Sequence, residues 1–137
     1  MKPPLFAGAI LGIAASLALA GCNEGQEPRT YVIATGGNPE HGKQLIQSYG
    51  CGACHIVPGV HGARGLVGPP LFYLSQRTMI AGELPNTPDD VARWIEHPKS
   101  VNPKTAMPDL GLTEDQAYDI AAYLYTLRGA EGTRWID

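Results

Sequence analysis

The sequence predicts an all-α fold with long connecting loops. Three segments carry helix start signals followed by apolar residues at helical spacing. Alternation of apolar and polar residues, the strand pattern, is nearly absent, and the connections are rich in glycine and proline. The chain has 137 residues and no internal repeat, so we expect a single folded domain.

The first helix is expected from Pro39 to about Tyr49. Asn38 is a suitable N-cap, and proline fits the first helical position. Small or apolar residues at helical spacing give this helix one packing face: Gly42, Leu45, Ile46 and Tyr49.

The second and third helices begin after threonine caps. Thr87 is followed by Pro88 and two acids that suit the positive helix terminus, and Pro98 is expected to end this helix. Its apolar face is formed by Val91, Trp94 and Ile95.

Thr113 opens the third helix, where Gln116 completes a capping-box pattern and Gly129 is the expected C-cap. Its buried side is formed by Ala117, Ile120, Ala121, Leu124 and Leu127.

The main functional signal is a pair of cysteines three positions apart, Cys51 and Cys54, with His55 directly after them. This spacing is the attachment pattern of a c-type haem. Each thiol can add across one vinyl group of the ring, and the imidazole can bind the iron from one axial side. One motif predicts one covalently bound haem. The ring also explains the long loops, because it offers apolar surface to a domain of this size.

Other uses of two close cysteines require other surroundings. A thioredoxin-like redox pair needs a βαβ context, and a structural zinc site needs four ligands. The only further cysteine is Cys22, far upstream. A zinc- or thiol-based binding module is the alternative to a haem protein.

Met107 is the candidate for the second axial ligand. It lies in a loop stiffened by Pro103 and Pro108, which is poorly placed for core filling but suited to presenting a ligand. A thioether raises the reduction potential relative to a second histidine. Because two protein ligands fill both axial positions, we expect an electron carrier. The alternative is a haem-based catalytic or sensor protein in which Met107 is a labile ligand.

Four other side chains are weaker ligand candidates. Met79 is expected to be a packing residue, and His97 to lie at the surface near a helix end. His61 lies too near His55 in a glycine-rich loop to reach the opposite side of the iron. His41, in the first turn of a helix, is expected to be solvated.

The first 21 residues have the features of a secretory signal, with a basic start and an uncharged apolar run of about sixteen residues. The sequence ending in Cys22 resembles the bacterial lipobox, which implies a lipid on that cysteine. Residues 22–37 are expected to be a flexible tether, 38–130 the folded domain and 131–137 a tail. The resemblance implies a cell-membrane lipoprotein whose domain faces the periplasm or extracytoplasmic side. An uncleaved apolar anchor is the alternative.

The chain carries a formal net charge of −3 and no basic cluster. It is therefore a poor candidate for binding nucleic acid.

With these residues identified, the chain from Asn38 to Leu127 resembles the class I cytochromes c. The resemblance implies that the Pro69 carbonyl, in Gly68-Pro69-Pro70-Leu71, accepts the proton of His55. It implies a haem-propionate contact for Arg77. It also implies that the first and last helices cross, with Gly42 and Ile46 facing Ile120 and Tyr123.

Two further segments match the helix and loop that deliver the distal methionine in this family. They are Trp94 to Lys99 and Thr105 to Pro108, and the resemblance makes Trp94 and Thr105 contacts of the cofactor. The stretch from Gly82 to Pro88 is similar to cytochrome c domains fused to subunit II of caa3-type oxidases. The copper-binding domain of those subunits is missing from this chain.

The resemblance implies single-electron transfer in a bacterial respiratory chain. The expected partners are a quinol-oxidising complex and a terminal oxidase, with the chain acting as carrier or as a subunit of a complex. Near the expected haem edge lie small or apolar residues, among them Val57, with Lys99 and Lys104 as the nearby cations. We therefore expect docking that depends weakly on salt.

Overall fold

The structure is a computed structural model that describes residues 35–128. Its α-helices are α2 (Pro39–Ser48), α3 (Pro88–Glu96), α4 (Pro98–Val101) and α5 (Glu114–Thr126). Two 3-10 helices, η1 (Cys51–Ala53) and η2 (Leu74–Gln76), lie in the long connection after α2. Strands β1 (Met79–Ile80) and β2 (Leu84–Pro85) form a small antiparallel pair.

The all-α prediction is confirmed, and the three predicted helices begin at their predicted caps. The Asn38 side chain accepts hydrogen bonds from the backbone N–H groups of Glu40 and His41 at 3.0 and 3.2 Å. Thr87 caps α3 in the same way. Thr113 and Gln116 form the reciprocal capping box at the start of α5.

The structure differs from the prediction in three places. Pro98 was expected only to end the second helix. It also begins the additional short helix α4, since its fixed φ suits a first turn. The turn between β1 and β2 has positive φ at Ala81 and Gly82, and only the glycine signalled it. Leu127 is the C-cap of α5, while Gly129 lies outside the described residues.

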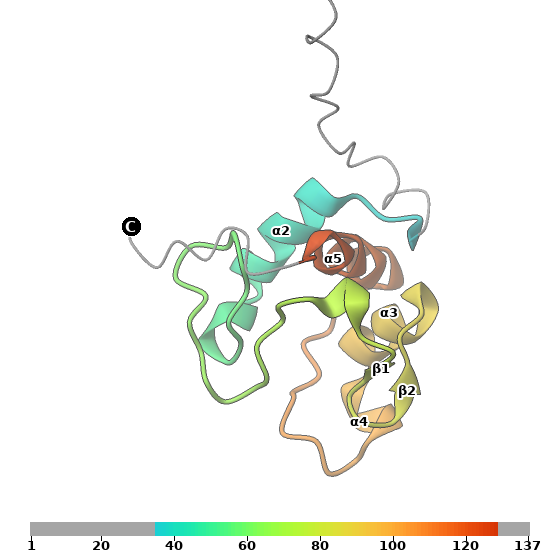
Figure 1. Ribbon diagram of the computed structural model, residues 1–137. Coiled ribbons are helices and arrows are strands. Elements are labelled where there is room, and N and C mark those ends of the chain that lie inside the picture. Colours follow the sequence, from blue (N-terminus) through green and yellow to red (C-terminus); the bar gives the residue numbers. More distant parts are fainter. Residues whose placement is uncertain (1–34, 129–137) are drawn as a thin grey trace, which may run out of the picture.

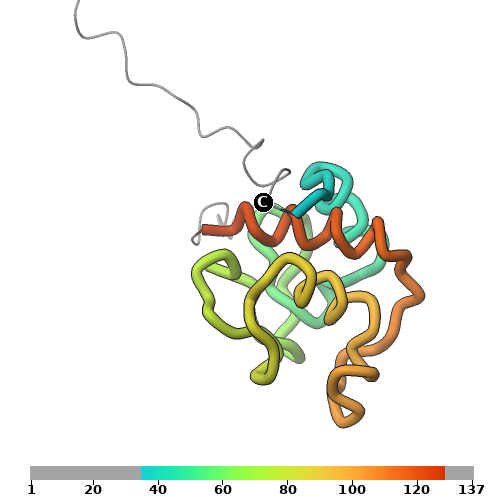
Figure 2. Tube along the Cα trace, turned by 90° about the vertical axis from the view of Figure 1, so that its right-hand side faces the viewer, coloured from blue at the N-terminus to red at the C-terminus, as the bar shows by residue number. Residues whose placement is uncertain are grey.

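The core forms where α2 and α3 pack on α5. In Figure 1, α2 and α3 both lie next to α5, and Figure 2 shows the same neighbours in a view turned by 90°. Gly42 makes the crossing possible, because a Cβ there would collide with the Asp119 carbonyl of α5. Ile46, Ile120 and Tyr123 belong to the buried cluster at this crossing. The helix crossing implied by the resemblance is therefore confirmed.

Polar contacts from α5 fasten the rest of the chain to this core. The buried Tyr123 hydroxyl donates to the Pro58 carbonyl at 2.6 Å. Burial raises the pKa of Tyr123 to about 12, so the neutral hydroxyl remains the donor at neutral pH. At the start of α2, His41 Nδ1 lies 2.6 Å from Asp119 Oδ2. The His41 side chain is exposed, as expected, and it is also paired with a carboxylate.

We predict that Gly42→Ala destabilises the domain by roughly 1–3 kcal/mol, because the new methyl group forces α2 away from α5. Urea unfolding would measure the change in the free energy of unfolding. Gln44→Ala, at an exposed position of the same helix, is the control and should shift that free energy by less than about 0.5 kcal/mol. Equal stabilities of the two variants would contradict the close crossing.

Candidate haem site

The two cysteines and the histidine lie on one tight turn. Gly50, with a positive φ of 69°, ends the segment after α2 and begins η1. The N–H groups of Cys54 and His55 both donate to the Cys51 carbonyl, at 3.2 and 3.0 Å. Both thiols are free and partly buried. Burial, and to a lesser extent the neighbouring Cys54, raise the pKa of the Cys51 thiol, which keeps it protonated at neutral pH.

The His55 ring is fixed by a backbone carbonyl. Its Nδ1 lies 2.8 Å from the Pro69 oxygen. Because a carbonyl oxygen can only accept, Nδ1 carries the proton and Nε2 keeps a lone pair that can bind a metal. Gly68 leaves room for the ring, since a Cβ at that position would collide with it.

The segment that holds His55 is itself tied to the cysteine motif. The Gly68 N–H donates to the Cys54 carbonyl at 2.8 Å, and the Leu71 N–H donates to the Ile56 carbonyl at 2.9 Å. Arg77 lies on the other side of this segment, where one guanidinium nitrogen donates to the Pro70 and Phe72 carbonyls at 2.5 and 3.1 Å. The contacts that the structure gives for Arg77 are thus to the backbone.

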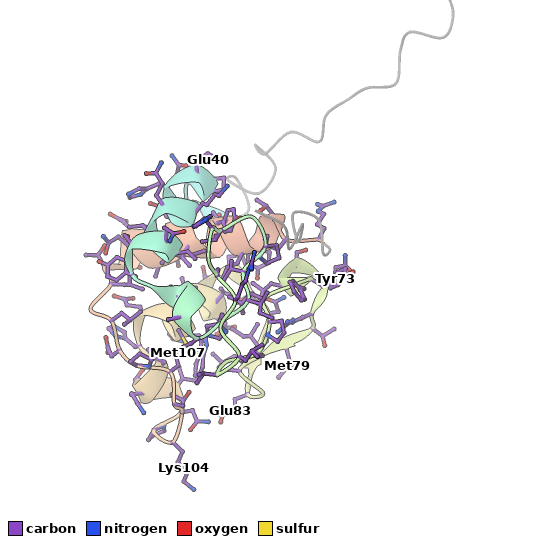
Figure 3. All side chains as sticks on the ribbon, turned by 90° about the vertical axis from the view of Figure 1, so that its left-hand side faces the viewer. Glu40, Tyr73, Met79, Glu83, Lys104 and Met107 are labelled. Carbon is purple, nitrogen blue, oxygen red and sulfur yellow. The ribbon has the colours of Figure 1, made fainter. Side chains whose placement is uncertain are left out.

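Met107 is carried by a loop with its own hydrogen bonds. Its N–H donates to the Thr105 hydroxyl at 3.1 Å, and the Lys99 ammonium donates to the Thr105 carbonyl. In Figure 3, Lys104 points away from the molecule at the end of this loop, whereas Met107 lies nearer the body. The structure thus brings Thr105 and Met107 together, and Met107 is partly buried. Trp94, on α3, is partly buried and packs against the core.

The weaker ligand candidates lie at the surface. The Met79 side chain is 48% exposed, so its assignment as a packing residue was wrong. Its place in the short strand β1 leaves it outside the core (Figure 3). His61 is exposed. His97 is exposed and caps the end of α3, with ring nitrogens 3.5 Å from Glu96 and 3.8 Å from Asp109.

The residues present fit a covalently bound haem. The two thiols could attach to the vinyl groups of the ring, and the imidazole with its available Nε2 and the Met107 thioether could bind the iron. Apolar side chains from separate segments pack against the core and remain partly open, as expected of side chains that an apolar ring would cover: Cys51, Leu71, Leu84, Trp94 and Leu110. Within residues 35–128, no three His, Cys, Asp or Glu side chains are grouped to hold a metal ion.

The fold and this motif define the class of small helical proteins that attach haem c. The model of the family described as Cytochrome c matches residues 39–128. A cytochrome c2 from Rhodopila globiformis is 33% identical over 106 residues, which cover 67% of this chain and 95% of the relative. The chain belongs to the cytochrome c family, and its fold is that of a class I cytochrome c. It is a c-type cytochrome, of a family that binds haem c covalently and carries electrons.

A second relative is much longer. The cytochrome c oxidase subunit 2 of Alkalihalophilus pseudofirmus is 31% identical over 91 residues, which cover 66% of this chain. The chain spans 26% of the length of that relative. The similarity is therefore to one part of the oxidase subunit.

Sequence reasoning missed two features of the site. The missing side chain of Gly68 makes room for the His55 ring. The side-chain amide of Asn86, between β2 and α3, donates hydrogen bonds to the backbone carbonyls of Leu74 and Arg77. A glycine before two prolines signals the first feature, but no local pattern signals the second.

We predict that Gly68→Ala displaces the His55 ring, because the added methyl group occupies its place. The expected result is a lower yield of haem-loaded protein and loss of the hydrogen-bonded Nδ1–H signal in the proton NMR spectrum. Leu66→Ala, in the same loop but 83% exposed in the structure, is the control and should preserve both. A wild-type spectrum for Gly68→Ala would contradict this packing.

Proposed function

We propose that this chain carries one haem, attached through Cys51 and Cys54, and transfers single electrons with His55 and Met107 as the axial ligands. The observation that carries the proposal is the hydrogen bond from His55 Nδ1 to the Pro69 carbonyl, because it turns Nε2 into the available ligand atom. The same turn of chain presents both thiols. Bound haem c supplies an iron that gains or loses one electron.

The protein ligands determine what this site can do. With haem bound, the His55 imidazole and the Met107 thioether would hold the iron and would leave no coordination position for a substrate. The hydrogen bond to Pro69 increases the electron donation of the imidazole. The hydrogen bond from the Met107 N–H to the Thr105 hydroxyl restrains the loop that carries Met107. A restrained loop needs little reorganisation when the charge of the site changes.

We predict that Met107→Ala leaves haem attached through both thioethers but opens one axial position. The reduction potential should fall and carbon monoxide should bind readily to the reduced protein, because the thioether is gone. Optical spectra and redox titration would measure both. Met79→Ala is the matched control, since this methionine is 48% exposed and should leave both unchanged.

Wild-type-like behaviour of Met107→Ala would eliminate Met107 as the ligand. Rapid carbon monoxide binding by the wild-type protein would instead favour a haem-based catalyst or sensor with a labile methionine. Purified protein without c-type haem bands would favour a zinc- or thiol-based binding module.

We propose further that the domain is tethered to a membrane outside the cytoplasm, by a lipid on Cys22 after removal of residues 1–21. The sequence before Cys22 supports this proposal. Cys22 and the segment before it lie outside the described residues. No helix within residues 35–128 has the length and hydropathy to cross a membrane. Residues 22–34 serve as the tether, which raises the concentration of the domain near membrane partners. The expected tether bound at residue 37 is wrong, because Thr35 is buried and Gly37 packs closely against the Tyr118 backbone of α5.

We predict that Cys22→Ser moves the haem-loaded protein from the membrane to the soluble fraction, because no lipid can be attached. Fractionation followed by haem staining would measure this, with Ser48→Ala, an exposed position on α2, as the control that stays in the membrane. Unchanged membrane association of Cys22→Ser would contradict the lipid and favour an uncleaved apolar anchor.

The proposed partners are a quinol-oxidising complex as donor and a terminal oxidase as acceptor, with the chain as carrier or complex subunit. The similarity to part of an oxidase subunit 2 supports an oxidase as acceptor.

The docking surface that we propose is the loop next to His55. Leu66 and Val67 are 83% and 76% exposed there, and the chain has no Asp or Glu between Glu40 and Glu83. One residue expected at this surface is placed differently. Val57 is buried and cannot take part. Lys99 is exposed, and its ammonium donates to the Thr105 carbonyl.

We predict that electron transfer to the acceptor changes less than about threefold between roughly 20 and 200 mM salt, because the proposed contact is apolar. The double variant Leu66→Ser, Val67→Ser should slow transfer about tenfold, as measured by stopped-flow spectroscopy. Lys104→Ala, the control, should stay within about twofold of wild type. A steep fall of the rate with salt would contradict an apolar contact.

A further inference from the structure

We infer that Asn86 is a positioning residue for the haem ligand His55, which it reaches through Arg77 and the backbone of residues 68–72. The inference rests on the proposed function, in which His55 binds iron. It concerns how the Pro69 carbonyl is held in place, since this oxygen fixes the ring.

The first step is the segment 68–72, which is held from two sides. Gly68, Pro69 and Leu71 bond to the stretch that carries the haem motif, at 2.8, 2.8 and 2.9 Å. The intervening Pro70 and Phe72 carbonyls point to Arg77 and accept hydrogen bonds at 2.5 and 3.1 Å. From Pro69 to Phe72, alternate residues thus face opposite partners. Since Pro69 and Pro70 lack N–H groups, their carbonyls are the only backbone groups that can hold them.

The second step is the backbone around Arg77, which Asn86 holds. The Asn86 side-chain amide donates to the Leu74 carbonyl at 2.7 Å and to the Arg77 carbonyl at 2.8 Å. These two carbonyls bracket η2, so one amide group fixes the 3-10 helix and the residue after it. The position from which Arg77 reaches Pro70 is thereby set.

The third step links Asn86 to the core. Its side-chain oxygen accepts a hydrogen bond from the Tyr125 hydroxyl of α5 at 2.9 Å. Burial raises the pKa of Tyr125 to about 12, so this hydroxyl remains a donor at neutral pH. An asparagine is required, because one end must donate twice while the other accepts. The contacts run from α5 through Asn86 and Arg77 to the carbonyl that orients His55.

Weakening this chain of contacts loosens the Pro69 carbonyl and lengthens the His55 hydrogen bond. The imidazole then donates less electron density, which disfavours the oxidised iron and raises the reduction potential. Asn86 is a better test than Arg77, because its replacement changes no charge near the iron.

The experiment compares Asn86→Ala, Tyr125→Phe and wild-type protein, all loaded with haem. Reduction potential and the NMR signal of the His55 Nδ1–H report on the ligand, and exchange of the Leu71 amide hydrogen reports on the segment. Tyr118→Phe is the matched control. It removes a tyrosine hydrogen bond from the same helix, at 3.0 Å to Asp89, that has no link to residues 68–72.

The expected potential rises from wild type to Tyr125→Phe and further to Asn86→Ala, with a shifted Nδ1–H signal. Leu71 exchange should be about tenfold faster in Asn86→Ala, and Tyr118→Phe should match wild type in every readout. Lower thermal stability of Asn86→Ala with wild-type potential, Nδ1–H signal and exchange would overturn the inference. If Asn86→Ala does not fold, Tyr125→Phe decides by the same readouts.

Failure of the proposed function is recognised separately, because wild-type protein would then take up no c-type haem. The Nδ1–H signal and the Leu71 exchange in haem-free protein would still show whether Asn86 positions His55.

Discussion

The hydrogen bond between His55 and the Pro69 carbonyl is the contact on which the site depends. It decides which ring nitrogen carries the proton, and therefore which nitrogen can bind iron. The bond requires a glycine at position 68 and a proline segment held at fixed distance from the cysteine turn. The helices matter to function because they hold these loops in place, and α5 does so through the hydroxyl groups of Tyr123 and Tyr125.

Much of the helical framework could be predicted from the sequence, because its signals are local. Asn38, Thr87 and Thr113 each cap a helix within four residues of the group that they bind. The cysteine motif is equally local. The short helix at Pro98 was missed because proline both follows one helix and begins the next, and a four-residue helix leaves no periodic pattern.

The parts that the sequence could not give depend on residues far apart in the chain. Asn86 and Tyr125 are separated by 39 residues, and nothing near either one indicates the hydrogen bond between them. Met79 was misplaced for a similar reason, since a single apolar side chain does not show on which side of a two-residue strand it will lie. The axial role of Met107 and the lipid on Cys22 stay predictions.

The crossing of α2 and α5 joins a segment that is translated early with one that is translated late. His41 and Asp119, which pair across it, are 78 residues apart. A nascent chain that has not yet reached α5 has nothing to cover the apolar face of α2. We therefore expect the cysteine turn, directly after α2, to stay accessible to haem until α5 has been made. Late closure of the core would leave a period in which both thiols can react with haem.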